Sequence, residues 1–303
     1  MIFKASVLIL TQNRPQILKK CLASLIKQTV LPDQIVVVDN GSGEKTEKAI
    51  LEFKKKIKID YFQEKIKGEA FSRNRALKLA KGDILIFIDD DCVADKNWVE
   101  NIINFFQKNP KPDGIVGRVE NLLRKNIYTN IYQCYYWRWL MENFKNFNQV
   151  QPLTLENTFF DTKNLAFKRA IVKNFSFDPD VLFHGVNVDS VAGETLVKKG
   201  NFFYYPQMIV FHQNWGSFKE LLVKNFYQGV ADEWICRKQK IENRDKPLNY
   251  SYWAWLRTCQ KEIENLNFQQ KLIFWLMLFL YPLPYKIGRM AYSIEYFKVK
   301  KFQ

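Results

Sequence analysis

Three adjacent aspartates, Asp89, Asp90 and Asp91, directly follow a run of five apolar residues at 84–88. Neighbouring carboxylates repel one another, and burial raises the cost of keeping them ionised, so the triplet needs a cation or several hydrogen-bond donors. If the chain stays extended past residue 88, Asp89 and Asp91 point to one side and Asp90 to the other. Two carboxylates on one side suit a hard divalent cation, which also accepts water and phosphate oxygens. A solvated acidic turn is the alternative interpretation.

Two other polar segments follow apolar runs in the same way. Residues 11–14, TQNR, end the run at 5–10, and residues 39–42, DNGS, end the run at 35–38. Apolar residues between these runs recur at helical spacing, so short strands alternate with helices. This order favours parallel strands joined by right-handed crossovers, whose carboxyl ends meet at one edge of the sheet. The three polar segments are therefore expected to converge.

The whole pattern predicts an α/β fold with a doubly wound, mostly parallel sheet flanked by helices. Strands are expected at residues 5–10, 35–38, 57–62, 84–88, 114–119, 164–167 and 208–211. Helices are expected at residues 16–28, 44–56, 70–81, 95–106 and 188–199, with Gly82 capping the third and Gly200 ending the fifth. Residues 127–147 are too aromatic on all sides for an ordinary surface helix.

Composition limits the classes of protein to consider. The chain has 303 residues, of which 47% are hydrophobic and 16% aromatic, and its formal net charge is +15. The basic surface suits phosphate-bearing ligands, anionic lipid or nucleic acid. The five cysteines are widely spaced, which argues for reduced thiols and against a disulfide framework or a zinc knuckle. Neither a P-loop nor a G-x-G-x-x-G motif occurs, so phosphate has to be held by a metal ion and basic side chains.

The C-terminal third differs in character. Residues 272–285, LIFWLMLFLYPLPY, are almost wholly apolar, but they are fewer than the ~20 residues that span a bilayer, and two prolines interrupt them. Basic residues follow, which favours a segment at the membrane interface; a C-terminal helix docked on its own domain is the alternative. The first ten residues lack a basic region, an apolar core and a cleavage site, so we expect a cytoplasmic protein, peripheral at the inner face of the cell membrane.

Several motifs, in order along the chain, resemble the inverting family-2 glycosyltransferases of GT-A fold, of the bacterial, membrane-associated type. They are SVLILTQNR at 6–14, QIVVVDNGS at 34–42, AFSRNRA at 70–76, IFIDDD at 86–91, GRV at 117–119 and NLAFKR at 164–169. The ordered set covers roughly residues 3–215 and is more specific than any single motif. The resemblance implies a nucleotide-diphosphate-sugar donor and a divalent metal cofactor, Mn²⁺ or Mg²⁺.

The resemblance also implies which residues bind the donor. Asp39 matches the acidic residue that holds the nucleoside, although an Asx-turn is its structural alternative. The other nucleotide-sugar-binding residues are Thr11, Asn13, Arg14, Arg73, Asp89 and Asp90. Asn13 could instead cap the helix that follows Pro15.

The aspartate triplet corresponds to the D-x-D element of the family. Asp91 matches the metal ligand, while Asp89 and Asp90 match residues that contact ribose, metal or metal-bound water. His212, after the apolar run at 208–211, resembles a histidine that can reach the metal or the diphosphate; a structural role is its alternative. The predicted metal ligands are therefore Asp89, Asp91 and His212.

Asp189 matches the aspartate of the family's Glu-Asp element and is the predicted general base. It would accept the proton of the attacking hydroxyl in one in-line displacement that inverts the anomeric carbon. The sequence departs from the family here, because Val188 replaces the expected Glu and Thr195 replaces an Arg that could orient or tune acidic groups. A helix cap is the structural alternative for Asp189, and Glu194 and Asp180 are poorer alternative bases.

On the acceptor side, His184 lies in a predicted loop, and Trp137 and Trp215 could stack on sugar rings, although most tryptophans only pack. We predict three parts: residues 1–118 as the nucleotide-sugar-binding half, 119–225 as the acceptor-binding half, and 226–303 as the helical membrane-interface segment.

The predicted function is metal-assisted sugar transfer to a hydroxyl of a lipid-linked or growing glycan at the cytoplasmic membrane surface. Alternatives are a nucleotidyltransferase on a similar scaffold, an inactive transferase fold at a membrane, and a nucleic-acid-binding protein. The last needs basic residues interleaved with aromatic ones. Instead, the aromatic clusters at 127–147 and 272–285 lie away from lysine runs such as residues 54–56, so no nucleic-acid partner is expected.

Overall fold

The computed structural model describes residues 3–155, 157, 160–179, 188–214, 216–238 and 252–293. The chain divides into two compact units. Unit 1 comprises Met1–Glu120, Asn148–Val181 and Val188–His212, and unit 2 comprises Asn121–Phe147, Leu182–Asn187 and Gln213–Gln303. The aromatic segment at 127–147 therefore shares a unit with the C-terminal helices. The predicted division into donor and acceptor halves is functional, and it stays a prediction.

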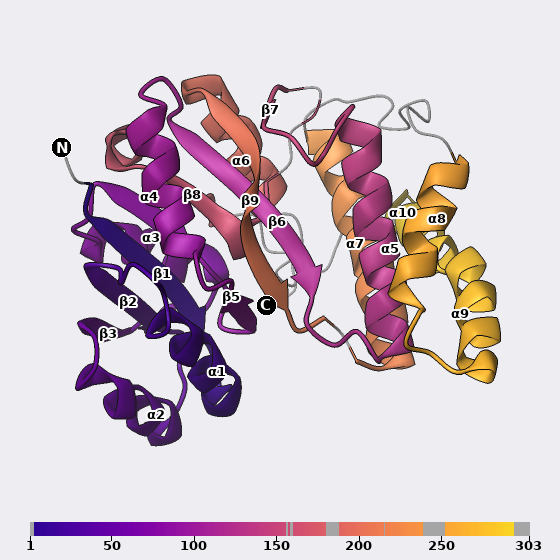
Figure 1. Cartoon of the computed structure of the whole chain (residues 1–303), viewed down its shortest axis with the longest axis horizontal. Helices are drawn as coiled ribbons and strands as arrows, with labels where there is room; N and C mark the ends of the chain where they lie inside the picture. The colour runs from indigo at the N-terminus through magenta and orange to yellow at the C-terminus, as the bar shows by residue number, and fades with distance from the viewer. Residues whose placement is uncertain are drawn as a thin grey trace. The chain divides into compact units, whose positions relative to one another are not determined.

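Unit 1 is built on a mixed sheet with strand order β3-β2-β1-β4-β8-β6-β9-β5, and β7 pairs with β9 (Figure 1). The strands are β1 (Ala5–Thr11), β2 (Gln34–Asp39), β3 (Ile59–Gln63), β4 (Ile84–Phe87), β5 (Cys92–Ala94), β6 (Gly114–Asn121), β7 (Gln151–Pro152), β8 (Leu165–Lys168) and β9 (Phe202–His212). The first four strands pair in parallel, whereas β8 pairs antiparallel with both β4 and β6. The predicted fold class is confirmed, and the antiparallel part is an addition to it.

The helices of unit 1 cover this sheet. They are α1 (Pro15–Leu25), α2 (Glu44–Lys54), α3 (Glu69–Leu79), α4 (Trp98–Lys108) and α6 (Val188–Lys199), with 3₁₀ turns at Thr162–Asn164 and Arg169–Asn174. β1, β2 and β4 are buried along nearly their whole length, as expected for strands covered on both faces. The predicted helices and strands are confirmed, with boundaries that shift by a few residues, whereas β5 and β7 were not predicted.

Two glycines in unit 1 are required by close backbone packing. Gly82 was predicted to cap α3, but that helix ends at Leu79, and its C-cap is Ala80, which has extended backbone angles. A Cβ on Gly82 would lie 2.6 Å from the backbone nitrogen of Ser6, so the glycine lets its loop pass against β1. A Cβ on Gly117 would overlap the carboxamide of Asn164, which is buried between β6 and β9.

Unit 2 is a group of helices around α5 (Ile127–Asn143). The others are α7 (Phe218–Lys238), α8 (Tyr252–Glu262), α9 (Phe268–Leu280) and α10 (Pro282–Ser293) (Figure 1). Helices α7, α8 and α9 all pack on α5, which explains why its sequence is aromatic all round. None of the helices in the described part of the chain is both long enough and apolar enough to span a bilayer.

Candidate active site

Three polar strand ends meet at one edge of the parallel strands, as the sequence predicts. Thr11, at the end of β1, is the register partner of Asp39 at the end of β2. The aspartate triplet begins two residues after the end of β4, which pairs with the other side of β1. This placement follows directly from parallel strands of similar length.

Asp90 is a fully buried carboxylate with two partners. The hydroxyl of Thr11 donates to its Oδ2 at 2.7 Å, and the guanidinium of Arg14 lies 2.7 Å from its Oδ1. Burial still raises the pKa of Asp90 to about 6, although Arg14 and the Thr11 hydrogen bond oppose the shift. Because the side chain has no exposed surface, the predicted contact of Asp90 with ribose or water finds no support. Asp90 instead holds the β1 end and the triplet together.

The triplet is not an extended continuation of β4, contrary to the expectation. The chain turns at Asp90 and Asp91 and enters the short strand β5 at Cys92. Asp91 therefore shares Arg14 with Asp90, at 3.0 Å, instead of pointing to the opposite side.

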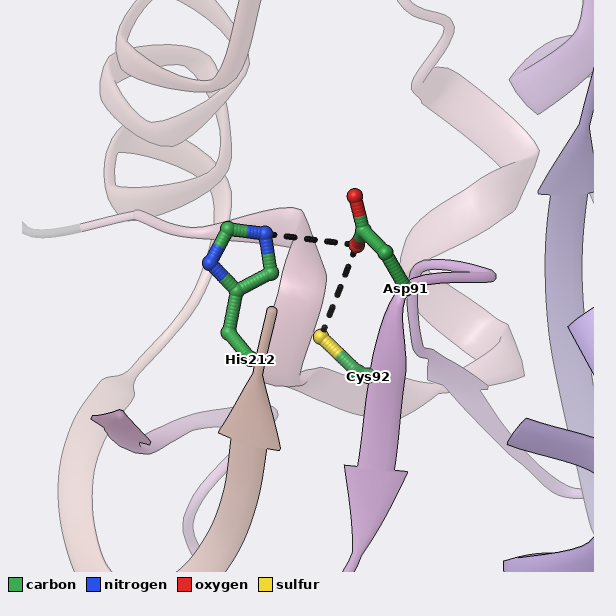
Figure 2. Close-up of side chains that lie close together, drawn as sticks. All are labelled: Asp91, Cys92 and His212. Atoms are coloured by element: carbon green, nitrogen blue, oxygen red, sulfur yellow. Dashed lines mark hydrogen bonds and ion pairs between the residues drawn. The ribbon is translucent and has the colours of Figure 1, made fainter. Parts of the chain in front are cut away.

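Asp91 faces His212, which ends β9 (Figure 2). The Nε2 of His212 lies 3.3 Å from Oδ1 of Asp91, and Cys92 is the antiparallel pairing partner of His212. Burial tends to raise the pKa of Asp91, but His212 and Arg14 outweigh it and hold this pKa well below the usual range. One ligand atom from each of Asp91, Cys92 and His212 falls within 4.8 Å of the others.

The ligand atoms of Asp91 and His212 fit a divalent cation of the Mn²⁺ type. A carboxylate oxygen and an imidazole nitrogen are suitable ligands for such an ion. Burial, with the nearby charges of Asp91 and Asp89, raises the pKa of the Cys92 thiol well above its ordinary value. The protonated thiol is a poor ligand, so Asp91 and His212 are the better donors.

Asp89 adds a carboxylate without a hydrogen bond or ion pair among the residues that the structure describes. Burial, and then the charge of Asp91, raise its pKa well above the ordinary value. An unpaired carboxylate beside Asp91 is what a bound cation or a ribose hydroxyl would satisfy. Its predicted role stays a prediction.

Asp189 lies in the first turn of α6 and is held by two side chains from elsewhere in unit 1. The hydroxyl of Thr162 donates to its Oδ1 at 2.9 Å, and Nη2 of Arg73 lies 3.3 Å from the same oxygen. Burial raises the pKa of Asp189, and Arg73 opposes that shift. The Arg that the family would place at position 195 is absent, yet Arg73 of α3 supplies a positive partner.

Arg73 contacts Glu69 and Thr162 as well as Asp189, the predicted base. Its side chain is 6% exposed, contacts Glu69 at 3.2 Å, and donates to Thr162 at 2.8 Å. Its Nη1 is buried and has no hydrogen-bond partner within the described structure. A buried guanidinium nitrogen without a partner is a donor available to an anionic ligand.

Asp39 and Asn13 lie beside the end of β1, and the carboxylate of Asp39 is used in local structure. The carboxylate of Asp39 accepts a hydrogen bond from the backbone of Ser42 and another from the hydroxyl of Tyr61, each at 2.8 Å. The first bond spans three residues, whereas the Asx-turn given above as the structural alternative would use the N–H of Gly41. Asn13 has a φ of 55° and does not cap α1, whose N-cap is Arg14.

The acceptor-side predictions receive no support from the structure. Trp137 is 6% exposed and its indole N–H donates to Glu262 at 2.9 Å, so little ring surface is left for a sugar. His184, Trp215 and Asp180 lie outside the described residues.

Sequence reasoning missed three residues around Asp189 and the triplet: Asp161, Thr162 and Lys163. The carboxylate of Asp161 accepts from the backbone of Lys163 and lies 2.8 Å from its Nζ. The positive charge of Lys163 lowers the pKa of Asp89, Asp91 and Asp189. The polar run DTK at 161–163, directly before the predicted strand at 164–167, was the available signal, because it resembles the polar segments that end the other strands.

Comparison with known proteins identifies the family. A model of "Glycosyl transferase family 2" matches residues 6–175, which is more than half of the chain. The chain belongs to glycosyl transferase family 2. The matched region contains the strand-end residues and the aspartate triplet, as the sequence motifs predict.

Individual relatives of this family-2 chain agree with the assignment. Chondroitin synthase of Escherichia coli is 24% identical over 224 residues, which are 65% of this chain but 33% of that protein. The chain thus spans a third of the length of that relative.

Solved structures share the fold. A mannosyltransferase of Pyrobaculum calidifontis, in complex with GDP-Man and Mn²⁺, is similar with a TM-score of 0.64 at 14% identity, covering 99% of this chain and 89% of that one. TarS of S. aureus, residues 1–349 in complex with UDP-GlcNAc, has a TM-score of 0.54 at 15% identity and covers 99% and 93%. These similarities confirm the predicted GT-A fold.

Proposed function

We propose that the chain transfers a sugar from a nucleotide-diphosphate-sugar to a hydroxyl of a glycan or lipid-linked acceptor, with inversion at the anomeric carbon. The observation that carries the proposal is the convergence, in unit 1, of Asp91 and His212 with the unpaired carboxylate of Asp89. A family-2 chain with carboxylates gathered at this sheet edge is suited to a nucleotide sugar and a divalent cation.

The donor is the better supported half of this proposal. Two proteins of the same fold were solved with GDP-Man and UDP-GlcNAc, so a nucleotide sugar is the expected ligand class. Nη1 of Arg73, which has no partner in the described structure, is placed to form a hydrogen bond to an anionic group of such a nucleotide sugar. The nucleotide base and the sugar are not specified by these contacts.

A divalent cation, Mn²⁺ or Mg²⁺, would be held by Asp91 and His212, with Asp89 beside them. When bound, such an ion offsets the negative charge that develops on a departing nucleoside diphosphate. The fold neighbour with GDP-Man also contained Mn²⁺, which supports this choice of cofactor. Arg14 fixes Asp91 from the other side and so limits how the carboxylate can turn.

Asp189 would take the proton from the attacking hydroxyl. Its carboxylate is oriented by Thr162 and Arg73, and its raised pKa makes it a stronger base than an ordinary aspartate. The first turn of α6 is also where a capping aspartate would lie, but the bonds of Asp189 run to α3 and to the turn before β8.

The acceptor class rests on the relatives. A polysaccharide synthase is among the curated relatives, which supports a growing glycan as the acceptor. A lipid-linked acceptor is consistent with the exposed apolar surface of unit 2 described below.

The test uses the purified chain, a panel of UDP- and GDP-sugars, and Mn²⁺. We expect at least one donor to raise the melting temperature and to release its nucleoside diphosphate slowly to water. Asp91→Ala should abolish both effects, whereas Glu264→Ala, an exposed acidic residue of unit 2, should leave them unchanged. If no donor has any effect, or if Asp91→Ala responds like the unmodified chain, the transferase proposal is wrong.

A further inference from the structure

Helices α9 and α10 present a continuous row of exposed apolar side chains on the surface of unit 2. We call it the apolar stripe, and its members are Phe268, Leu272, Leu276, Phe279, Leu283, Ile287 and Met290. Successive members within each helix are three or four residues apart, so each helix presents one apolar face. Phe268 is 82% exposed, and every other member is at least 48% exposed.

The opposite face of the same helices is packed into unit 2. Phe274, Leu278 and Tyr281 are buried in a cluster with Trp255 of α8 and residues of α5. The docked-helix interpretation drawn from the sequence therefore holds for this face, whereas the other face is exposed and the membrane-interface interpretation stays a prediction. Leu and Phe side chains exposed in a row of this length indicate an interaction surface.

The stripe is held in position by tight packing of α10 against α7. A Cβ on Gly229 would overlap the carbonyl oxygen of Tyr285, and a Cβ on Gly288 would overlap that of Phe226. The side-chain amide of Asn225 donates to the carbonyl of Tyr281, next to the helix junction. The stripe is therefore a preformed surface, which lowers the entropy cost of docking.

Polar contacts add to this packing. The hydroxyl of Tyr285 donates to Asp232 at 2.9 Å, and Arg289 contacts Glu233 at 3.0 Å. Both acidic partners lie on α7, so they also join α10 to it.

The charges around the stripe identify its partner. No acidic residue occurs in α9 or α10, while Lys271 and Lys286 lie within one helical turn of stripe residues. Neither lysine side chain has a hydrogen bond or ion pair in the described part of the chain. An apolar row flanked by free cations and lacking carboxylates matches the acyl and headgroup regions of an anionic lipid surface.

We propose that the apolar stripe docks unit 2 on an anionic membrane surface, with α9 and α10 lying along the interface. The stripe residues enter the acyl region, and Lys271 and Lys286 contact the lipid phosphates. This surface belongs to unit 2, whereas the donor and metal residues belong to unit 1, so the proposal does not depend on the proposed function. Docking at the inner face of the cell membrane would give the location predicted from the sequence.

The test is flotation of the full chain with vesicles containing phosphatidylglycerol, compared with vesicles of pure phosphatidylcholine. Leu276→Glu with Phe279→Glu should weaken binding about a hundredfold or more, because two large apolar side chains no longer leave water. Lys271→Gln with Lys286→Gln should weaken binding to anionic vesicles about fivefold per lysine, and should leave weak binding to neutral vesicles unchanged. Leu51→Glu, at a 49% exposed position of α2 in unit 1, is the matched control and should float normally.

Sedimentation velocity without lipid tests whether the apolar stripe binds a second copy of the chain instead of a membrane. A monomer that floats more strongly with anionic vesicles than with neutral ones supports the proposal. A dimer that the Leu276 and Phe279 substitutions convert to a monomer, without flotation, would overturn it in favour of self-association. Flotation that is unchanged in the glutamate variant would also overturn it. Circular dichroism melting of each variant shows that the change acts on binding and not on folding, and donor turnover without lipid should match the unmodified chain.

Discussion

The substitution Asp189→Asn keeps the shape of the predicted base and removes its ability to accept a proton. General-base catalysis contributes about 10²- to 10⁴-fold to a rate, which corresponds to roughly 2.7–5.4 kcal/mol of activation free energy. We therefore expect turnover to fall by that factor. Donor binding should change little, because the proposed donor contacts are made by other residues of unit 1.

The stability of this variant can be argued from the surroundings of the carboxylate. Burial raises the pKa of Asp189 despite the opposing charge of Arg73 at 3.3 Å, so folding makes the ionised form of this carboxylate less favourable than it is in the unfolded chain. An amide is uncharged, and its oxygen can still accept from the Thr162 hydroxyl, while the longer bond from the Thr162 backbone N–H to the other oxygen, at 3.3 Å, is lost. Arg73 keeps its contact with Glu69. We expect the free energy of unfolding to change by no more than about 1 kcal/mol.

The assay measures release of the nucleoside diphosphate, with donor affinity determined separately by calorimetry. The unmodified chain should lose activity as the pH falls through the raised pKa of Asp189, because a protonated carboxyl cannot act as a base. This loss should be absent from the residual activity of Asp189→Asn. Glu194→Gln, on the same helix, should retain full turnover. Turnover within tenfold of normal in Asp189→Asn, together with a loss in Glu194→Gln, would show that the base is misassigned.

Gly117→Ala should destabilise the protein by about 3 kcal/mol, because the new Cβ would overlap a buried carboxamide. Gly43→Ala is the control, because nothing lies within 4 Å of the Cβ it adds, and it should change the melting temperature little. Equal shifts of the melting temperature in the two variants would contradict this reasoning. Arg14→Gln removes the cation that opposes the raised pKa of Asp90, which is about 6. An aspartate in the unfolded chain has a pKa of ~3.9. Without metal, the free energy of unfolding should therefore decrease as the pH rises from that value to the pKa of Asp90 in the folded protein. In Arg14→Gln the pKa of Asp90 should be higher still, so the decrease should continue above pH ~6. Melting curves of both proteins between pH ~5 and ~8 measure it, and parallel curves would refute it. His212→Ala should lower Mn²⁺ affinity about 10- to 100-fold in calorimetry, and an unchanged affinity would exclude His212 as a ligand.

The parallel half of the sheet and its polar edge could be predicted from local pattern. β1, β2 and β4 are continuous apolar runs that each end in polar residues, and parallel pairing alone brings Thr11 beside Asp39. The positions of these strands and of their polar ends were predicted correctly because the order of apolar and polar residues along the chain determines them. The same reasoning failed for Gly82, which was predicted to be a helix cap. A glycine is required there because the backbone passes close to β1, which is far away in the sequence.

The contacts within the site could not be predicted, because they join distant segments. Arg14 reaches Asp90 and Asp91 across more than seventy residues, and nothing in its own segment indicates that partner. The prediction that the chain stays extended through the aspartate triplet was wrong, because the chain turns there and enters β5. The three residues of β5 are too few to show a periodicity in the sequence. As a result, Asp90 was expected at a ligand and is instead buried against Thr11.

Position 195 shows how a departure from a family motif can mislead when only sequence is considered. The missing Glu and Arg made an inactive transferase fold conceivable, and a buried aspartate without a positive partner would be costly to ionise. In the structure, Thr195 only donates to the carbonyl of Val191 within α6, and the cation beside Asp189 comes from Arg73 on α3. Arg73 also carries a buried nitrogen without a partner in the described structure. One residue thus tunes the proposed base and offers a donor to the ligand, so the absent Arg is not evidence against catalysis.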